Sequence, residues 1–87
     1  FCNDDLAQGG LLAAQRLGVA VPAQVAIAGF NDLAGSDQMV PPLTTVRYDM
    51  ATFAERLWDQ AERILDGAEP EGTPSALDIT LVERESV

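Results

Sequence analysis

A continuous apolar run, Val25-Ala-Ile-Ala-Gly-Phe30, constrains the fold more than any other feature of this 87-residue sequence. The run is short, it is bounded by turn-forming residues, and polar residues do not alternate within it. This pattern is typical of a strand that is buried on both faces, as in a parallel sheet. The sequence therefore predicts an α/β fold.

The residues before this run predict a helix. Asn3 or Asp4 can cap a helix that ends near Leu17, with Gly18 as its stop and Pro22 preventing continuation. Its expected core face is Ala7, Gly10, Leu11, Ala14 and Leu17. Because Phe1–Cys2 has the character of the end of a strand, the start of the chain predicts one βαβ unit of a parallel sheet and a fragment of a larger domain.

The second half of the chain predicts a shorter series of elements. We expect a helical turn within residues 33–39, a strand or extended crossover over 43–48, and a helix over 50–66 with Asp49 as its N-cap. That helix has a strong apolar stripe, made of Met50, Phe53, Ala54, Leu57, Ala61, Ile64 and Leu65. A surface loop over 69–75 should precede a half-buried edge strand over 77–84. Its expected inward side holds Leu77, Ile79, Leu81 and, less cleanly, Val82.

Composition excludes several functions. The net charge is −9 and the five basic residues are all arginines, so direct DNA binding by this segment is not expected. A single cysteine, Cys2, and the absence of histidine argue against a disulfide framework and against a catalytic set, so no enzyme and no cofactor is predicted. The spacing of Asp4, Asp5, Asp32 and Asp37 matches no metal-binding loop, and helix capping or solvated turns explain them better. No apolar run approaches the roughly 20 residues of a membrane span.

Two asparagines follow the expected strands. Asn3 comes after Phe1–Cys2, and Asn31 comes after the apolar run. Open parallel sheets bind ligands beyond the carboxyl ends of their strands, and two side-chain amides there can read the hydroxyls of a polyol. The alternative is purely structural, with Asn3 as a helix cap and Asn31 in a turn; the pattern alone leaves both interpretations open.

Four motifs in order resemble a known family. They are Phe-Cys-Asn-Asp-Asp-Leu-Ala (1–7) with the following Leu-Gly-Val to Val-Pro (17–22), Val-Ala-Ile-Ala-Gly-Phe-Asn-Asp (25–32), Pro-Pro-Leu-Thr-Thr-Val (41–46) and Leu-Val-Glu-Arg-Glu-Ser (81–86). Each motif is weak alone, but together they resemble the lactose/galactose-repressor (LacI/GalR) family of transcriptional regulators. The resemblance covers the whole chain and about the last third of a typical effector-binding core.

The resemblance implies a periplasmic-binding-protein-like type I fold of two α/β lobes. On that template residues 1–46 belong to the C-terminal lobe, and residues 47–67 form the third crossover and a helix of the N-terminal lobe. Residues 76–87 would then return as a strand of the C-terminal lobe. The helix stripe would face a partner largely outside this sequence.

The resemblance also implies an effector site. Asn3 matches an effector-contacting asparagine, and Asn31 matches a position usually held by an aspartate that binds sugar hydroxyls. Because asparagine does not repel an anion and can donate to a carboxylate, the expected effector is a sugar acid such as gluconate, or a neutral sugar held by altered contacts. Tyr48 and Met50 fall where the crossover lines the cleft, and are weaker candidates. No metal is expected.

Relatives of this family form homodimers through this lobe. The resemblance places the interface at Gln8, Leu11, Leu12, Gln38 and Met39. It implies a cytoplasmic repressor that contacts operator DNA only through an N-terminal helix-turn-helix outside this chain, without membrane contact. The alternative is a periplasmic or ABC-transporter-type sugar-binding protein of the same fold.

Overall fold

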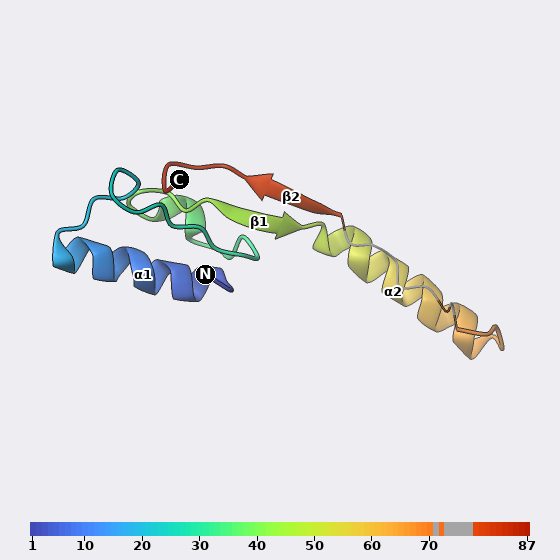
Figure 1. Cartoon of the computed structure of the whole chain (residues 1–87). Helices are drawn as coiled ribbons and strands as arrows, with labels where there is room; N and C mark the ends of the chain where they lie inside the picture. Colours follow the sequence, from blue (N-terminus) through green and yellow to red (C-terminus); the bar gives the residue numbers. More distant parts are fainter. Residues whose placement is uncertain (71, 73–77) are drawn as a thin grey trace. The chain divides into compact units, whose positions relative to one another are not determined.

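The computed structural model describes residues 1–70, 72 and 78–87 (Figure 1). The chain divides into two compact units. The first contains residues 1–47 and 79–87, and the second contains residues 48–78. Residues 71 and 73–75 of the predicted loop, and residues 76 and 77 of the predicted returning strand, lie outside the described residues.

The first unit is built on helix α1, Asp4–Leu17. Asn3 accepts a hydrogen bond from the Leu6 amide at its start, and Gly18 ends it in the left-handed conformation. Both boundaries match the sequence prediction, because the capping side chain and the glycine act locally and need no tertiary partner.

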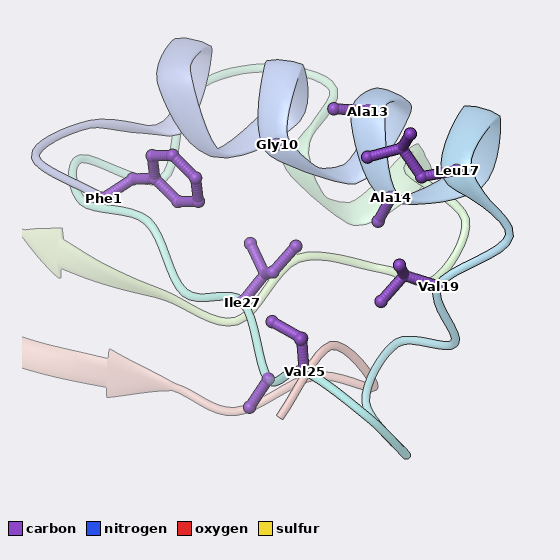
Figure 2. A pocket seen from close by; sticks show the side chains of 9 residues that line it. Phe1, Gly10, Ala13, Ala14, Leu17, Val19, Val25 and Ile27 are labelled. Atoms are coloured by element: carbon purple, nitrogen blue, oxygen red, sulfur yellow. The ribbon is translucent and has the colours of Figure 1, made fainter.

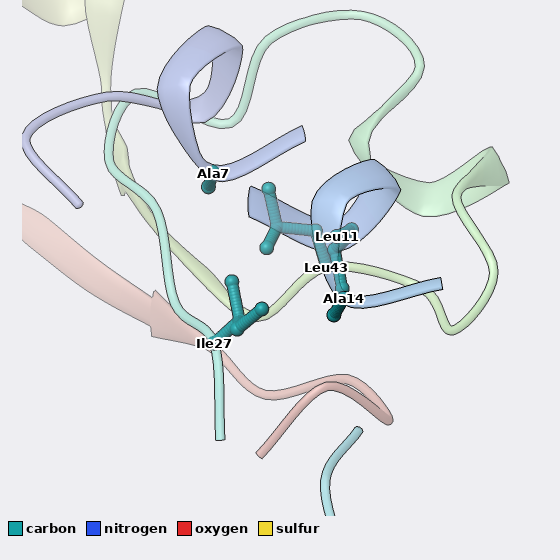
Figure 3. Close-up of a cluster of buried hydrophobic side chains, with 5 residues drawn as sticks. All are labelled: Ala7, Leu11, Ala14, Ile27 and Leu43. Atoms are coloured by element: carbon teal, nitrogen blue, oxygen red, sulfur yellow. The ribbon is translucent and has the colours of Figure 1, made fainter. Parts of the chain in front are cut away.

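A small hydrophobic core joins α1 to the rest of this unit (Figure 3). Its members, all buried, are Ala7, Leu11, Ala14, Ile27 and Leu43. Three of the five predicted α1 core positions are therefore confirmed. Leu17 is not one of them, since it is 78% exposed at the last turn of the helix.

The predicted buried strand over 25–30 is only partly correct. The segment is extended, but its only bridge in the described part of the chain is a single parallel one between Ala28 and Thr44. Ile27 and Gly29 are buried whereas Ala26 and Ala28 are exposed, so one face lies against α1 and the other is uncovered. Phe1 forms no strand either, although its amino group donates to the Ala28 carbonyl at 2.9 Å. A strand needs consecutive bridges on one neighbour. Here the Ile27 amide donates to the Ser86 carbonyl and the Gly29 amide to the Thr44 carbonyl, so the acceptors lie on two different segments.

The sheet consists of β1, Thr45–Tyr48, paired with β2, Ile79–Val82. Their arrows run in opposite directions in Figure 1. The inward alternation predicted for the last strand is wrong for β2, because Ile79 and Leu81 are about 60% exposed and Val82 is the half-buried residue. A 3₁₀ turn, η1, Ser36–Gln38, lies within the helical turn expected at 33–39.

The second unit is dominated by helix α2, Met50–Leu65. The predicted cap is confirmed, since Asp49 accepts from the Thr52 amide at 3.0 Å and from its hydroxyl at 2.7 Å. These hydrogen bonds favour the ionised carboxylate and lower the pKa of Asp49. No residue of α2 is buried, so the described part of the chain gives its apolar stripe no complete cover.

Two glycines provide a test of this packing. A Cβ at Gly29 would collide with the Asp4 carboxylate and lie 3.1 Å from the Asp4 Cα, whereas a Cβ at Gly9 meets nothing within 4 Å. We expect Gly29→Ala to destabilise the fold by about 1–3 kcal/mol through overpacking. Gly9→Ala should instead stabilise α1 by about 0.5–1 kcal/mol. Urea unfolding of both variants checks this, and equal midpoints would contradict the close approach at Gly29.

Candidate functional site

Asn3 lies at the N-terminus of α1. Its backbone is extended, with φ −154°, and its side-chain oxygen caps the helix by accepting from the Leu6 amide at 2.9 Å. The side chain is half-buried. Asn3 therefore has the helix-capping role that the sequence allowed. The cap uses the side-chain oxygen, and the side-chain nitrogen keeps its capacity to donate to a ligand.

Asn31 lies in a turn with unusual backbone geometry. Its φ is +105° and that of Asp32 is +49°, so two consecutive residues other than glycine adopt positive φ. Asparagine and aspartate tolerate this region better than other side chains. The Asn31 side chain is exposed, while its backbone N–H donates to the Val46 carbonyl at 2.8 Å.

Asn3 and Asn31 are brought to one edge of the first unit. The amide of Asp4, next to Asn3, donates to the carbonyl of Phe30, next to Asn31, at 3.1 Å. The prediction that both asparagines follow neighbouring extended segments is thus met by the backbone, although neither segment is a full strand.

Asp4 is the buried centre of this edge. It is fully buried and accepts from the Ser36 hydroxyl at 2.6 Å, the Thr45 hydroxyl at 2.5 Å and the Leu33 amide at 2.8 Å. Burial raises the pKa of Asp4, but hydrogen bonds from Ser36, Thr45 and Leu33 outweigh it and hold the pKa below its ordinary value. The carboxylate therefore stays ionised at neutral pH.

Asp32 forms a second acidic centre beside Asn31. Its two oxygens are shared between two arginines, with Arg84 at 2.8 Å on Oδ1 and Arg47 at 2.6 Å on Oδ2. Burial raises the pKa of Asp32, and the two guanidinium groups more than reverse this and lower it. Arg84 also donates to the Leu43 carbonyl at 2.8 Å.

Sequence reasoning did not find these two acidic centres. Asp4 was expected to act at the helix N-terminus, and Asp32 as a turn residue. Their partners lie far along the chain, up to 52 residues away for the Asp32–Arg84 pair, so no local pattern could connect them. Among the described residues, no group of three potential ligands could hold a metal ion.

Tyr48 and Met50 belong to the second unit. Tyr48 is the last residue of β1 and is half-buried; Met50 is the first residue of α2 and is 59% exposed. Each is thus placed at an element boundary of its own unit.

The residues predicted for a dimer interface differ in exposure. Leu12 is 54% exposed, Gln38 is exposed, and Gln8 and Met39 are half-buried. The predicted interface role of Leu11 is wrong. Leu11 is only 1% exposed and packs in the core with Leu43, so it has no surface available to another subunit. The three-to-four-residue repeat of α1 turns Leu11 inward and its neighbour Leu12 outward.

An open pocket of different character lies between α1 and the extended segment near Ile27 (Figure 2). Apolar residues line it: Phe1, Gly10, Ala13, Ala14, Leu17, Val19, Val25, Ala26 and Ile27. Because these side chains carry no polar groups, this pocket is unsuited to reading sugar hydroxyls.

The buried carboxylate of Asp4 yields a prediction. Asp4→Asn places an amide group against the donors of Ser36, Thr45 and Leu33, and should lower the free energy of unfolding at pH 7 by about 2–4 kcal/mol. The folded pKa is depressed, so this stabilisation is present above the ordinary value of 3.8 and is lost as the pH falls through the folded value.

The difference between wild type and Asp4→Asn should therefore shrink in acid. Urea unfolding between pH 7 and pH 2.5 measures it, with the exposed neighbour Asp5→Asn as the matched control. A difference that stays constant over this range would contradict an ionised Asp4.

Comparisons with known proteins agree on one family. A family model described as a periplasmic binding protein-like domain matches residues 1–87. The HTH-type transcriptional regulator GntR of Pseudomonas aeruginosa is 45% identical over 86 residues, which cover 99% of this chain and 25% of that protein. The regulator AscG of Escherichia coli is 33% identical over 98% of this chain and 25% of its own length.

Solved structures give the same result. The transcription regulator GntR from Chromobacterium violaceum superposes with a TM-score of 0.85 at 42% identity, over 98% of this chain and 31% of that one. A dimeric Lac repressor superposes with a TM-score of 0.86 at 27% identity, over 98% of this chain and 31% of its own.

The α/β, periplasmic-binding-protein-like fold expected from the sequence is thus confirmed, and the chain spans about a quarter of the length of the curated relatives named here. The four motifs occur in a chain that matches these regulators from end to end. The chain belongs to the LacI/GalR family of transcriptional regulators and contains part of their periplasmic-binding-protein-like domain.

Proposed function

We propose that this chain is the ligand-sensing and dimerisation part of a bacterial DNA-binding repressor that responds to a sugar or a sugar acid. The observation that carries the proposal is the pairing of Asn3 and Asn31 through the Asp4–Phe30 backbone hydrogen bond. It puts two side-chain amides at one edge, where open α/β sheets bind ligands. The relatives support a regulatory role and not an enzymatic one, since they are named transcriptional regulators.

The chemistry at this edge favours an anionic effector. Asn31 carries no charge, and the carboxylate next to it in the sequence, Asp32, is neutralised by two arginines. An aspartate at position 31 would add a negative charge that repels a carboxylate ligand. A sugar acid such as gluconate fits this surface, with hydroxyls for the amide groups and a carboxylate that meets no unpaired acid at Asn31.

The proposed mechanism is a shift between two conformations. Residues 1–46 and 76–87 would belong to the C-terminal lobe, and residues 47–67 to the third crossover and the N-terminal lobe. Effector bound between the lobes, with Tyr48 and Met50 as further contacts, would favour one arrangement and change the spacing of two operator-reading headpieces. Those headpieces would be N-terminal helix-turn-helix units of the full-length protein, acting in the cytoplasm.

No helix in the described part of the chain is long and apolar enough to cross a membrane. The net charge of −9, with only five basic residues, disfavours operator contact by this segment and supports contact elsewhere in the protein.

Calorimetric titration of the full-length protein tests the effector. We expect gluconate to bind more tightly than neutral hexoses, and Asn31→Asp to weaken gluconate binding by about tenfold or more, because the new carboxylate repels the ligand. Asp59→Asn, at an exposed position of α2 in the second unit, serves as a control that changes charge without altering this edge. Tight binding of neutral hexoses that survives in Asn31→Asp would exclude the sugar-acid assignment.

Dimerisation is proposed through the outer face of α1 and the segment around η1. Leu12 is 54% exposed on this face, and Gln8, Gln38 and Met39 are the other proposed contacts. A large exposed leucine beside polar residues is well suited to burial against an identical surface. A related Lac repressor is itself described as dimeric.

Leu12→Glu should convert the full-length protein from dimer to monomer, because each subunit would bury an introduced carboxylate in the proposed interface. Light scattering measures the mass. Ala23→Glu, an exposed position in the turn after α1, is the matched control and should leave the dimer intact. A dimer that persists in Leu12→Glu would rule out this surface.

A further inference from the structure

We propose that Asp32 is a positioning residue for the effector site: its carboxylate, held by Arg84 and Arg47, fixes the left-handed turn that presents Asn31. This inference rests on the proposed function for its ligand, but its structural part can be tested without any ligand. It starts from a backbone that needs explanation. Asn31 and Asp32 both have positive φ, a conformation that side chains other than glycine adopt only when their surroundings hold them there.

Backbone hydrogen bonds supply part of that restraint. Three consecutive amides of the turn have acceptors: Asn31 donates to the Val46 carbonyl at 2.8 Å, Asp32 to the Thr45 hydroxyl at 3.3 Å, and Leu33 to the Asp4 carboxylate at 2.8 Å. The middle bond is the longest of the three. The residue at the centre of the turn is therefore held least well by its own backbone.

The side chain of Asp32 compensates for this weakness. Arg84 donates to Oδ1 at 2.8 Å, and the Nε of Arg47 donates to Oδ2 at 2.7 Å. The carboxylate and Arg84 are only 11% and 15% exposed, so water screens their interaction weakly. Charge-assisted hydrogen bonds to two arginines restrict the carboxylate in two directions. A hydrogen bond to a single flexible partner would restrict it in only one.

The two arginines are themselves anchored to different segments. Arg47 belongs to β1, next to the Val46 carbonyl that receives the Asn31 amide. Arg84 follows β2 and is fixed by its own amide on the Thr44 hydroxyl, and by a guanidinium bond to the Leu43 carbonyl, both at 2.8 Å. Asp32 thus ties the turn to β1 through Arg47 and to the segment after β2 through Arg84. Asn31 is the residue directly before Asp32, so the same contacts restrain it.

Asp32→Asn isolates the ionic part of this role. Asparagine tolerates positive φ as well as aspartate does and keeps one acceptor oxygen, but it removes the charge that holds both arginines. Asp32→Glu keeps the charge, but its longer side chain tolerates positive φ less well than aspartate, so it should restore part of the effect. Asp59→Asn is the matched control, because it removes an exposed Asp–Arg pair, at 3.0 Å to Arg63, from α2.

Hydrogen–deuterium exchange of the full-length protein is the first readout. In Asp32→Asn, peptides spanning residues 30–34 should exchange at least tenfold faster, while peptides spanning 25–29 stay at the wild-type rate. Asp59→Asn should leave both unchanged. Unchanged exchange at 30–34, or equal acceleration at 25–29, would overturn the inference, since the second result means general loosening of the fold. Should Asp32→Asn fail to fold, Arg47→Gln removes only the more exposed pair and should accelerate the same peptides to a smaller degree.

Gluconate titration is the second readout. Asp32→Asn should raise the dissociation constant at least tenfold, with operator affinity in the absence of effector within twofold of wild type. Asp32→Glu should recover part of the lost affinity. An unchanged dissociation constant would refute the positioning role. If wild type binds neither gluconate nor hexoses, the proposed function loses its effector, and the exchange experiment alone decides the role of Asp32.

Discussion

The first unit depends on one buried carboxylate. Asp4 is fully buried, and it receives a hydroxyl from η1, a hydroxyl from β1 and an amide from the turn after Phe30. A charge in such a place is tolerated only when its oxygens are fully hydrogen bonded, and here each oxygen has a partner. One residue at the start of α1 therefore holds three segments that are separated by 29 to 41 residues in sequence. Gly29 belongs to the same arrangement, because only a residue without Cβ fits beside this carboxylate.

The C-terminus closes this unit in a similar way. Ser86 is fully buried; its hydroxyl donates to the Ile27 carbonyl at 2.6 Å and accepts from the Thr44 amide at 2.8 Å. Its backbone accepts from the Ile27 amide and donates to the Pro42 carbonyl. The last residues thus supply hydrogen bonds that a regular neighbouring strand would otherwise provide. This explains how residues 25–30 stay extended with only one bridge.

The two acidic centres, Asp4 and Asp32, have different structural roles at the candidate site. Asp4 holds the framework, and its hydrogen-bonding partners are two hydroxyls and a backbone amide. Asp32 holds the turn, and its partners are two charged side chains, one of which is 55% exposed. Asp4 is ionised but fully buried, so salt screens its hydrogen bonds less than it screens the more exposed Asp32–Arg47 pair.

Local signals determined much of this protein. The bounds of α1 and α2 agree with the sequence within one residue, because Asn3, Asp49 and Gly18 act on the adjacent backbone and the apolar repeats follow the helical period. The motifs also indicated the family, which the comparisons confirmed. Tertiary structure alone decided the rest. Val25–Phe30 was expected to be covered on both faces, and Ile79 and Leu81 to face inward, but burial depends on which segments lie alongside, and in the described residues those faces lack complete cover. The partners of Asp4 and Asp32 could not be predicted from the sequence either. The residues around a carboxylate are the same whether it contacts water or an arginine 52 residues away.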